Sequence, residues 1–380
     1  MNLFDLDPQH PSSLPSTIGW SFREARILQV AVRLKLFTAL NEEAKSAQRL
    51  SVELRTNAEM TERLLVALAS LDLVIHDEGM WRNCLAASIY LVEAQPLYQG
   101  DVIEMAAGVW KIYDDLERLV REGGDEELFH PGSRQQPEYK TYIRAMHAIA
   151  VAGQAQRLAR FMGALAARRT LLDVGGAPGT YSIALCQRFP GLRATVWDTP
   201  DALALTEPVV HQHELSERIR LKEGDWRKDR LGRSEYEALL LNHLLMGTES
   251  NVLPLLVKGY EALKPGGLLI VQNRVLDDDL NGNLDAALDN VLEGLLTLEQ
   301  MRTIIAEAGF ERVTLLYRSQ QGSDILTAHK PMDAPPSTRE VLMERISPEQ
   351  ELFALMGLGE EETGESLLRR LSGEYWAQPN

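Results

Sequence analysis

Apolar residues near the N-terminus recur at the spacing of amphipathic helices. The helical spacing covers Phe22–Leu40, a short stretch that Ser51 is placed to cap, and Met60–Leu73. It changes to an alternating, strand-like pattern over Val74–Trp81, around a glycine-containing turn. Three helices followed by a hairpin predict a winged helix. The apolar face of Phe22–Leu40 is too large for so small a domain to cover, so we expect it to pair with a second copy of the chain.

The middle of the chain reads as helical. Two long stretches, Val102–Arg121 and Pro137–Ala167, are separated by the polar, glycine-containing segment Glu122–Gln136. They predict a helical connection between the N-terminal region and a different kind of domain.

From Thr170 onward short apolar runs alternate with helical patterns. Strands are predicted at Thr170–Val174, Ala194–Asp198, Ile219–Lys222, Tyr236–Leu241 and Leu268–Gln272, and helices at Thr180–Arg188, after Pro200, at Glu249–Leu263 and at Leu298–Ala308. This order predicts an α/β, Rossmann-like domain with a parallel sheet covered by helices on both faces. Arg312–Tyr317 and Asp324–His329 then predict an antiparallel pair at the sheet edge.

These patterns divide the chain into four parts. We expect a winged-helix domain over residues 1–100, a helical linker that contributes to an acceptor pocket over 101–168, and the α/β domain over 169–330. Residues 331–380 form a C-terminal extension to which the sequence assigns no role.

Composition and charge limit the kinds of molecule that the protein is expected to bind. The net charge of −16 disfavours nucleic acid, because a polyanion is repelled by it, and the hairpin turn of the winged helix is itself acidic. Cys84 and Cys186 lack the spacing of a metal site, and His211 and His213 have no third ligand in view, so no metal is predicted. No apolar run approaches the roughly 18 residues that span a membrane, and the N-terminus lacks a signal-peptide pattern. We therefore expect a cytoplasmic protein that acts on a small molecule.

The end of the first predicted strand carries the clearest chemistry. Asp173 is followed by a turn of small residues that contains Gly175, Gly176 and Gly179 and leads into a helix. Small side chains allow a ligand to approach the backbone closely, and the helix N-terminus offers free N–H groups. The spacing does not fit the dinucleotide pattern G-x-G-x-x-G, and no lysine follows as in a P-loop. The turn therefore favours neither a nicotinamide cofactor nor ATP.

Two further strand ends carry polar residues at the same predicted edge. Asp198, followed by Thr199, ends the second strand, where a carboxylate can accept hydrogen bonds from both hydroxyls of a ribose or simply cap the next helix. Gly224, Asp225 and Trp226 follow the third strand, with a carboxylate for an adenine amino group and an indole to stack on the ring. Ligands bind at the carboxyl edge of parallel sheets, so the three sites together predict one nucleoside-binding pocket.

At this point residues 19–330 resemble the S-adenosylmethionine (SAM) dependent O-methyltransferases of the acetylserotonin, caffeate and hydroxyneurosporene type. Asp173–Gly179 is similar to the family's DVGGGxG with alanine at the third glycine, and the chain also carries counterparts of its FPxL, DLP, ALKPGG and AGF motifs at Phe189–Leu192, Trp197–Pro200, Ala262–Gly267 and Ala308–Phe310. The resemblance implies a seven-stranded sheet, a winged-helix homodimerisation domain and SAM as cofactor. It also implies cofactor contacts from Asp173, Gly175, Gly176, Gly179, Asp198, Thr199, Gly224, Asp225, Trp226 and Asn242. The candidates for acceptor contacts are Tyr142, Met146 and His147, on the helix where relatives build their acceptor pockets, together with Trp110 and Gln272. Trp110 and the residues of that helix can equally be part of the core.

The sequence departs from this family where the catalytic base is expected. Relatives that methylate hydroxyls usually place a histidine just after the fourth strand, and here Leu244, Leu245 or Met246 occupies that place. His243 lies slightly earlier and is the catalytic candidate, either pointing into the site or packing behind it. Gln272 replaces the acidic residue that normally ends the fifth strand, which keeps hydrogen bonding but removes the charge.

The sequence therefore predicts a dimeric SAM-dependent methyltransferase for a small, aromatic or polyketide-like acceptor. Because the histidine is displaced, we expect this acceptor to be acidic or a carbon nucleophile. Two alternatives stay open. One is a SAM-binding homologue that catalyses a decarboxylation, hydroxylation or rearrangement, and the other is a non-enzymatic winged-helix regulator.

Overall fold

A computed structural model describes residues 13–123, 138–247, 249–279, 284–319 and 323–333. Within these residues the chain forms two compact units, one of 13–123 with 138–152 and the other from 153 to 333. The predicted C-terminal extension, apart from its first three residues, lies outside the described residues.

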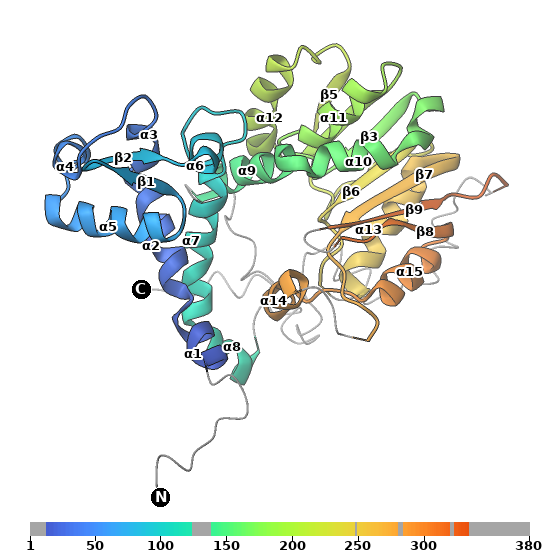
Figure 1. Cartoon of the computed structure of the whole chain (residues 1–380). Helices are drawn as coiled ribbons and strands as arrows, with labels where there is room; N and C mark the ends of the chain where they lie inside the picture. Colours follow the sequence, from blue (N-terminus) through green and yellow to red (C-terminus); the bar gives the residue numbers. More distant parts are fainter. Residues whose placement is uncertain (1–12, 124–137, 248, 280–283, 320–322, 334–380) are drawn as a thin grey trace, which may run out of the picture. The chain divides into compact units, whose positions relative to one another are not determined.

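The first unit is mainly helical and contains one hairpin (Figure 1). Its elements are α1 (Ser13–Trp20), α2 (Phe22–Arg33), α3 (Leu36–Ala39), α4 (Ala47–Leu54), α5 (Ala58–Ser70), β1 (Val74–Asp77), β2 (Met80–Asn83), α6 (Leu85–Tyr90), α7 (Gly100–Asp114), α8 (Leu116–Glu122) and α9 (Glu138–Ile149). The predicted order of helices followed by a hairpin is present, and the side chains of α2 to β2 share one hydrophobic core. That core contains Val32, Leu36 and Phe37, so most of the apolar face of Phe22–Leu40 is covered within the unit, contrary to the prediction that the domain is too small to cover it.

Two local details differ from the sequence pattern. The helical pattern over Phe22–Leu40 is broken at Lys35, whose φ of 56° is left-handed, so α2 ends before α3 begins. The cap of α4 is Ser46, whose side chain accepts from the Arg49 amide, and not Ser51. Ser51 lies inside the helix, where its hydroxyl donates to the Gln48 carbonyl at 2.8 Å. Extended backbone at Ser46 permits the cap geometry, while Ser51 has already entered the helix.

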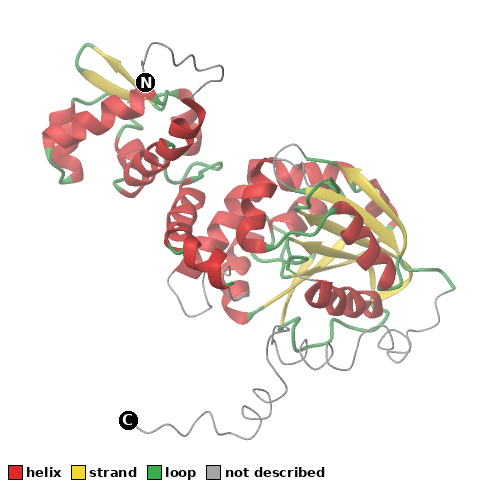
Figure 2. Ribbon diagram, turned by 90° about the horizontal axis from the view of Figure 1, so that it is seen from below, coloured by secondary structure: helices red, strands yellow, loops and turns green. Residues whose placement is uncertain are grey.

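The second unit is a seven-stranded sheet between two layers of helices. The connection η3 (Ala150–Gln154) leads into α10 (Ala155–Phe161), η4 (Gly163–Ala167), β3 (Thr170–Val174), α11 (Thr180–Arg188), β4 (Arg193–Asp198), α12 (Pro200–Gln212), β5 (Ile219–Glu223), β6 (Tyr236–Asn242), α13 (Glu249–Ala262), β7 (Leu263–Asn273), α14 (Leu284–Glu293), α15 (Leu298–Glu307), β8 (Glu311–Tyr317) and β9 (Asp324–His329). Figure 2 shows its strands flanked by helices on both sides. The predicted strands and their order are confirmed.

The order of the strands in the sheet determines where a ligand can bind. The strands run β5-β4-β3-β6-β7-β9-β8, with β3 to β7 parallel and the last two strands antiparallel to their neighbours. The chain winds outward from β3 through β4 to β5, then returns to the other side of β3 with β6. Such a reversal opens a crevice at the carboxyl ends of the two central strands, where α/β proteins bind ligands.

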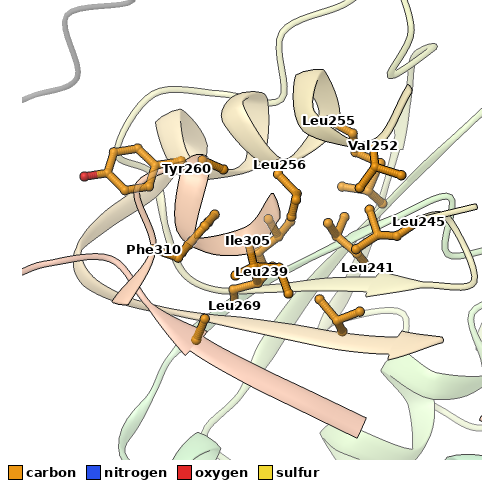
Figure 3. Close-up of a cluster of buried hydrophobic side chains, with 14 of the residues drawn as sticks. Leu239, Leu241, Leu245, Val252, Leu255, Leu256, Tyr260, Leu269, Ile305 and Phe310 are labelled. Carbon is orange, nitrogen blue, oxygen red and sulfur yellow. The ribbon is translucent and has the colours of Figure 1, made fainter. Parts of the chain in front are cut away.

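Leucine-rich strands bury both faces of this sheet. One core lies beneath α13 and α15 and includes Leu239, Leu241 and Leu269 (Figure 3). The other lies beneath α10, α11 and α12 and includes Leu171, Leu240 and Ile270. Consecutive residues of one strand enter opposite cores, so the strands read as continuous apolar runs instead of alternating ones.

Helix α14 was not predicted. Its apolar residues Leu284, Leu288 and Val291 are exposed, while Asp289 and Glu293 turn inward and pair with Arg274 at the end of β7. The pattern is therefore inverted relative to an ordinary surface helix. Burial raises the pKa of Glu293 to about 7, with Arg274 opposing the shift.

Candidate functional site

The glycine turn after β3 requires its glycines for two different reasons. Gly175 and Gly179 have φ values of 61° and 85°, a region that side chains rarely adopt. Gly176 has no such backbone requirement, but a Cβ there would lie 2.5 Å from the Asp173 carboxyl carbon. Gly179 is also the N-cap of α11, so the turn leads directly to a helix N-terminus.

Backbone hydrogen bonds draw the ends of β3, β4 and β5 together. The Gly175 amide donates to the Trp197 carbonyl at 2.7 Å, and the Gly224 amide donates to the Asp198 carbonyl at 3.0 Å. The Asp198 carboxylate spans the gap, because Oδ2 accepts from the Ala177 amide at 3.1 Å and Oδ1 from the Thr199 amide at 2.7 Å. Asp198 therefore faces the glycine turn, as a ribose ligand requires, and it also orders that turn.

Asp173 is buried behind the turn. It is 1% exposed, and its Oδ2 accepts from the Ser182 hydroxyl at 2.6 Å, while its Oδ1 has no hydrogen-bond partner. Removal from water raises the pKa of Asp173 to about 7, against the opposing effect of Ser182. At neutral pH this carboxyl group is therefore close to its midpoint.

We expect Asp173→Asn to change how stability depends on pH. Because the folded-state pKa lies above the unfolded value, the folded protein binds the proton more tightly, and this contribution to stability is lost as pH rises from about 4 through about 7. The asparagine variant, which does not titrate, should gain stability relative to wild type across that window. Thermal unfolding at pH 5, 6, 7 and 8 measures the difference. A difference that is constant with pH would contradict the assigned pKa.

The segment after β5 supplies the predicted adenine-side residues. A Cβ on Gly224 would lie 1.9 Å from the Trp197 indole nitrogen, so only glycine fits there. Asp225 Oδ1 accepts from the Arg227 amide at 3.1 Å, which closes a tight turn. Trp226 is partly buried, and the Arg227 guanidinium lies 5.0 Å from its ring centre. Lys258 holds this turn by donating to the Trp226 carbonyl at 2.8 Å.

The loop after β6 places its residues in three different environments. The Leu244 side chain is partly buried at the margin of the core beneath α13 and also reaches the glycine turn, since a Cβ on Gly175 would lie 3.0 Å from it. Leu245 is 0% exposed and belongs to the core beneath α13, near Leu241 and Val252 (Figure 3). Met246 is partly buried.

The His243 side chain points neither to the glycine turn nor into the core beneath α13. Its backbone is left-handed at φ 53°, and its Nε2 lies 2.8 Å from the hydroxyl of buried Ser323, just before β9. Burial lowers the pKa of His243 to about 3, and Arg274 adds to the effect. Its ring is therefore neutral at physiological pH and a weak proton acceptor.

The predicted acceptor residues, apart from Gln272, lie in the first unit. Trp110 on α7 meets Phe22 edge to face at 6.3 Å, and Tyr142 on α9 stacks on Tyr139 at 6.5 Å. Met146 and His147 are partly buried one turn further along α9.

A polar cluster around Gln272 was missed by the sequence reading. The Tyr181 hydroxyl, on the first turn of α11, donates to Gln154 Oε1 at 2.9 Å. Gln272 Nε2 donates to the same oxygen at 3.2 Å and to the Tyr181 hydroxyl at 3.3 Å. Asn242 also hydrogen-bonds Tyr181, and burial raises the pKa of Tyr181 to about 12. No sequence motif predicts this cluster, because its members come from four separate elements.

The residues at this edge fit SAM. Glycines form a cradle that a side chain would fill, and Asp198 sits above it with its carboxylate. Thr199 Oγ1, beside Asp198, is buried without a hydrogen-bond partner, as expected of a group that binds a ligand. Among the described residues no group of three or more His, Cys, Asp or Glu side chains is arranged to hold a metal ion, and no helix is long and apolar enough to cross a membrane.

Comparison with known proteins agrees with this geometry. Residues 113–319 match the family model of the O-methyltransferase domain, and residues 20–93 match that of the O-methyltransferase dimerisation domain. The chain is 30% identical to the 3-hydroxy-5-methyl-1-naphthoate 3-O-methyltransferase of Streptomyces sahachiroi, over 70% of this chain and 78% of that protein. It is 26% identical to the N,N-dimethyltransferase OxyT of Streptomyces rimosus, over 76% and 88% respectively.

A solved structure shares the fold. Human N-acetylserotonin methyltransferase in complex with SAM superposes with a TM-score of 0.76 at 22% identity, covering 86% of this chain and all of that one. The two family models together cover most of the chain, with the dimerisation domain first and the O-methyltransferase domain, which contains the glycine turn, after it. This protein belongs to the O-methyltransferase family, and it is a methyltransferase that uses SAM.

Proposed function

We propose that this protein transfers a methyl group from SAM to a small aromatic or polyketide-like acceptor without a histidine base. One observation carries the proposal: the loop after β6 presents Leu244 to the glycine turn and buries Leu245, while His243 is held by Ser323. None of these side chains is placed to take a proton from an acceptor at the turn. The naphthoate-methylating relative supports the aromatic class of acceptor.

In this proposal the residues at the strand ends bind and orient. The turn from Gly175 to Gly179 and the Asp198 carboxylate hold the cofactor, with Gly224, Asp225 and Trp226 on the adenine side. When bound, SAM supplies an electrophilic methyl group on a sulfonium centre. Alignment of the acceptor with that group supplies much of the rate, since well-oriented reactants gain about 7–11 kcal/mol. The helices of 101–168, with Trp110, Tyr142, Met146 and His147, are proposed to shape the acceptor side.

Methyl transfer is tested by incubating the full chain with SAM and a panel of aromatic hydroxy and amino compounds. S-adenosylhomocysteine (SAH) and methylated product are measured by mass spectrometry. We expect transfer to at least one acceptor, with the same rate in His243→Ala. A protein that binds SAH but methylates no acceptor would instead favour a non-methylating homologue. Loss of transfer in His243→Ala, with SAH binding intact, would show that His243 is the base after all.

Asp198 gives the second test of the proposal. Asp198→Ala should weaken SAH binding by about 1–3 kcal/mol, because hydrogen bonds to a charged carboxylate are lost. Asp198→Asn is the conservative comparison: its single amide oxygen can still accept from the Ala177 amide, but its NH₂ group cannot accept from the Thr199 amide, so this variant removes the charge and one acceptor while it keeps the size of the side chain. Calorimetry with SAH measures both variants. Unchanged affinity in Asp198→Ala would remove the ribose assignment.

A homodimer is proposed for the first unit. The matched dimerisation domain begins at Trp20, which is 56% exposed and stacks on exposed Phe22, with exposed Ile18 beside them. Such an apolar patch is unfavourable in water and typical of an interface. Light scattering at micromolar concentration should report a dimer, and Trp20→Glu should shift the population toward monomer. A wild-type monomer under these conditions would refute the proposal.

A further inference from the structure

Asn242 and Gln272 end neighbouring strands at the same level of the sheet edge. They are register partners in the β6–β7 pair. Both follow residues whose side chains enter the core beneath α13, so alternation along each strand directs both amides to the opposite face, the one that α10 and α11 cover. Two primary amides therefore lie side by side at the carboxyl ends of β6 and β7, next to the point between β3 and β6 where the sheet order reverses.

Tyr181 and Gln154 fix the direction of these amides. Gln272 Nε2 donates to two acceptors, the Gln154 side-chain oxygen at 3.2 Å and the Tyr181 hydroxyl at 3.3 Å. Asn242 also bonds to Tyr181, and because its own oxygen has no partner, its amide nitrogen makes that contact. With both nitrogens engaged, both oxygens must face away from the tyrosine.

Those two oxygens lack donors. Gln272 is 2% exposed, and neither its Oε1 nor Asn242 Oδ1 has a hydrogen-bond partner. A buried acceptor without a donor is costly, and in native proteins it usually marks an absent ligand or water. A ligand group that carries two N–H donors matches the pair of oxygens.

We propose that the paired oxygens of Asn242 and Gln272 hold an amino group of the acceptor, so that an amine nitrogen is the nucleophile. This inference rests on the proposed function and names the substrate class that the same site takes, a neutral amine in place of the acidic or carbon nucleophile that the sequence predicts. Tyr181 is a positioning residue in it, because Tyr181 acts through the two amides.

The chemistry favours nitrogen over oxygen. An amide oxygen is far too weak a base to remove the proton of a phenol, and the loop after β6 offers no base either. A neutral amine needs no deprotonation before it reacts. With its two N–H groups donated to the amide oxygens, its lone pair points away from them toward the methyl group. The N–C bond forms as the methyl C–S bond breaks, the electron pair stays on sulfur, and the ammonium product then releases a proton to water.

The test uses a matched pair of probes, 3-amino-2-naphthoate and 3-hydroxy-2-naphthoate, which differ only in the nucleophile. We expect the full-length protein to methylate the amine and to leave the hydroxyl nearly unchanged. Gln272→Met should lower kcat for the amine about tenfold, the scale of one hydrogen bond, with SAH affinity retained. Tyr181→Phe should lower kcat for the amine while KM for SAM stays constant.

Gln272→Glu should change the preference of the protein between the amine and the hydroxyl probe, and misfolding cannot produce such a change. Its carboxylate adds a proton acceptor, so methylation of the hydroxynaphthoate should rise by about 100-fold. Gln187→Glu, the same change at an exposed position of α11, is the control and should behave as wild type.

Several results would overturn the inference. One is methylation of the hydroxyl in preference to the amine by wild type. Another is a lack of N-methylation together with intact SAH binding, a result that leaves the assignment of the cofactor site unaffected.

The α-ammonium of the cofactor carries the same donors, so calorimetry compares SAH with 5′-methylthioadenosine, which lacks that group. If Gln272→Met weakens only SAH, the oxygens hold the cofactor and not the acceptor. If the wild-type protein does not bind SAH, the proposed function itself is refuted.

Discussion

Gly175→Val is expected to abolish measurable SAH binding while the protein stays folded. The residue has a φ of 61°, which a β-branched side chain does not adopt without strain, and its Cβ would press against Leu244 at 3.0 Å. The branched methyls would also fill the cradle between the glycine turn and Asp198. Together these effects should weaken SAH binding by more than about 100-fold, since misfit of about 3 kcal/mol suffices for that loss. Calorimetry gives the affinity, and circular dichroism and thermal unfolding give the fold.

Gly79→Val is the matched control for this change. Gly79 has a similar φ of 78°, in the β1–β2 turn, and a Cβ there would meet no atom within 4 Å. It therefore imposes the same backbone strain away from the cradle. If both variants bind SAH equally well, the turn from Gly175 to Gly179 is not the cofactor cradle.

Leu244→His is expected to create O-methylation of 3-hydroxy-2-naphthoate where wild type has little. Leu244 is the residue of this loop whose side chain reaches the glycine turn, so an imidazole there is close to the reacting groups. General-base assistance typically contributes about 10²- to 10⁴-fold. Leu244→Met fills a similar volume without a proton acceptor and should show no gain. The rate should rise with pH as the new imidazole loses its proton.

Leu245→His should behave differently, although sequence alone makes it an equal candidate. Leu245 is 0% exposed in the core beneath α13, so a histidine there buries a polar ring without a partner. We expect a loss of about 2–4 kcal/mol in stability and no new activity. A gain of O-methylation in Leu245→His but not in Leu244→His would mean that the loop presents Leu245 to the acceptor.

The sequence determined the architecture because the relevant signals are local. Apolar runs set the strands, and the bounds of β3, α11 and β9 were predicted to the residue. Gly175 and Gly179 have left-handed backbone, which glycine adopts without the steric cost that other residues incur. The orientation of helix α14 could not be predicted, because its apolar stripe faces outward and its acidic side turns inward to Arg274. Periodicity gives the two sides of a helix but not which of them meets the protein.

Only the tertiary structure decided what each side chain in the site faces. Leu244 and Leu245 are the same residue type at adjacent positions, yet Leu245 is enclosed in the core, while Leu244 lies at the margin of that core and reaches the glycine turn. The loop after β6 turns at left-handed His243, just before them. Tyr181 and Gln154 carry no motif, and they reach Gln272 only because the end of η3 and the start of α11 lie next to the end of β7. Short-range spacing fixes the elements, but such contacts join residues up to 118 positions apart, and packing alone brings them together.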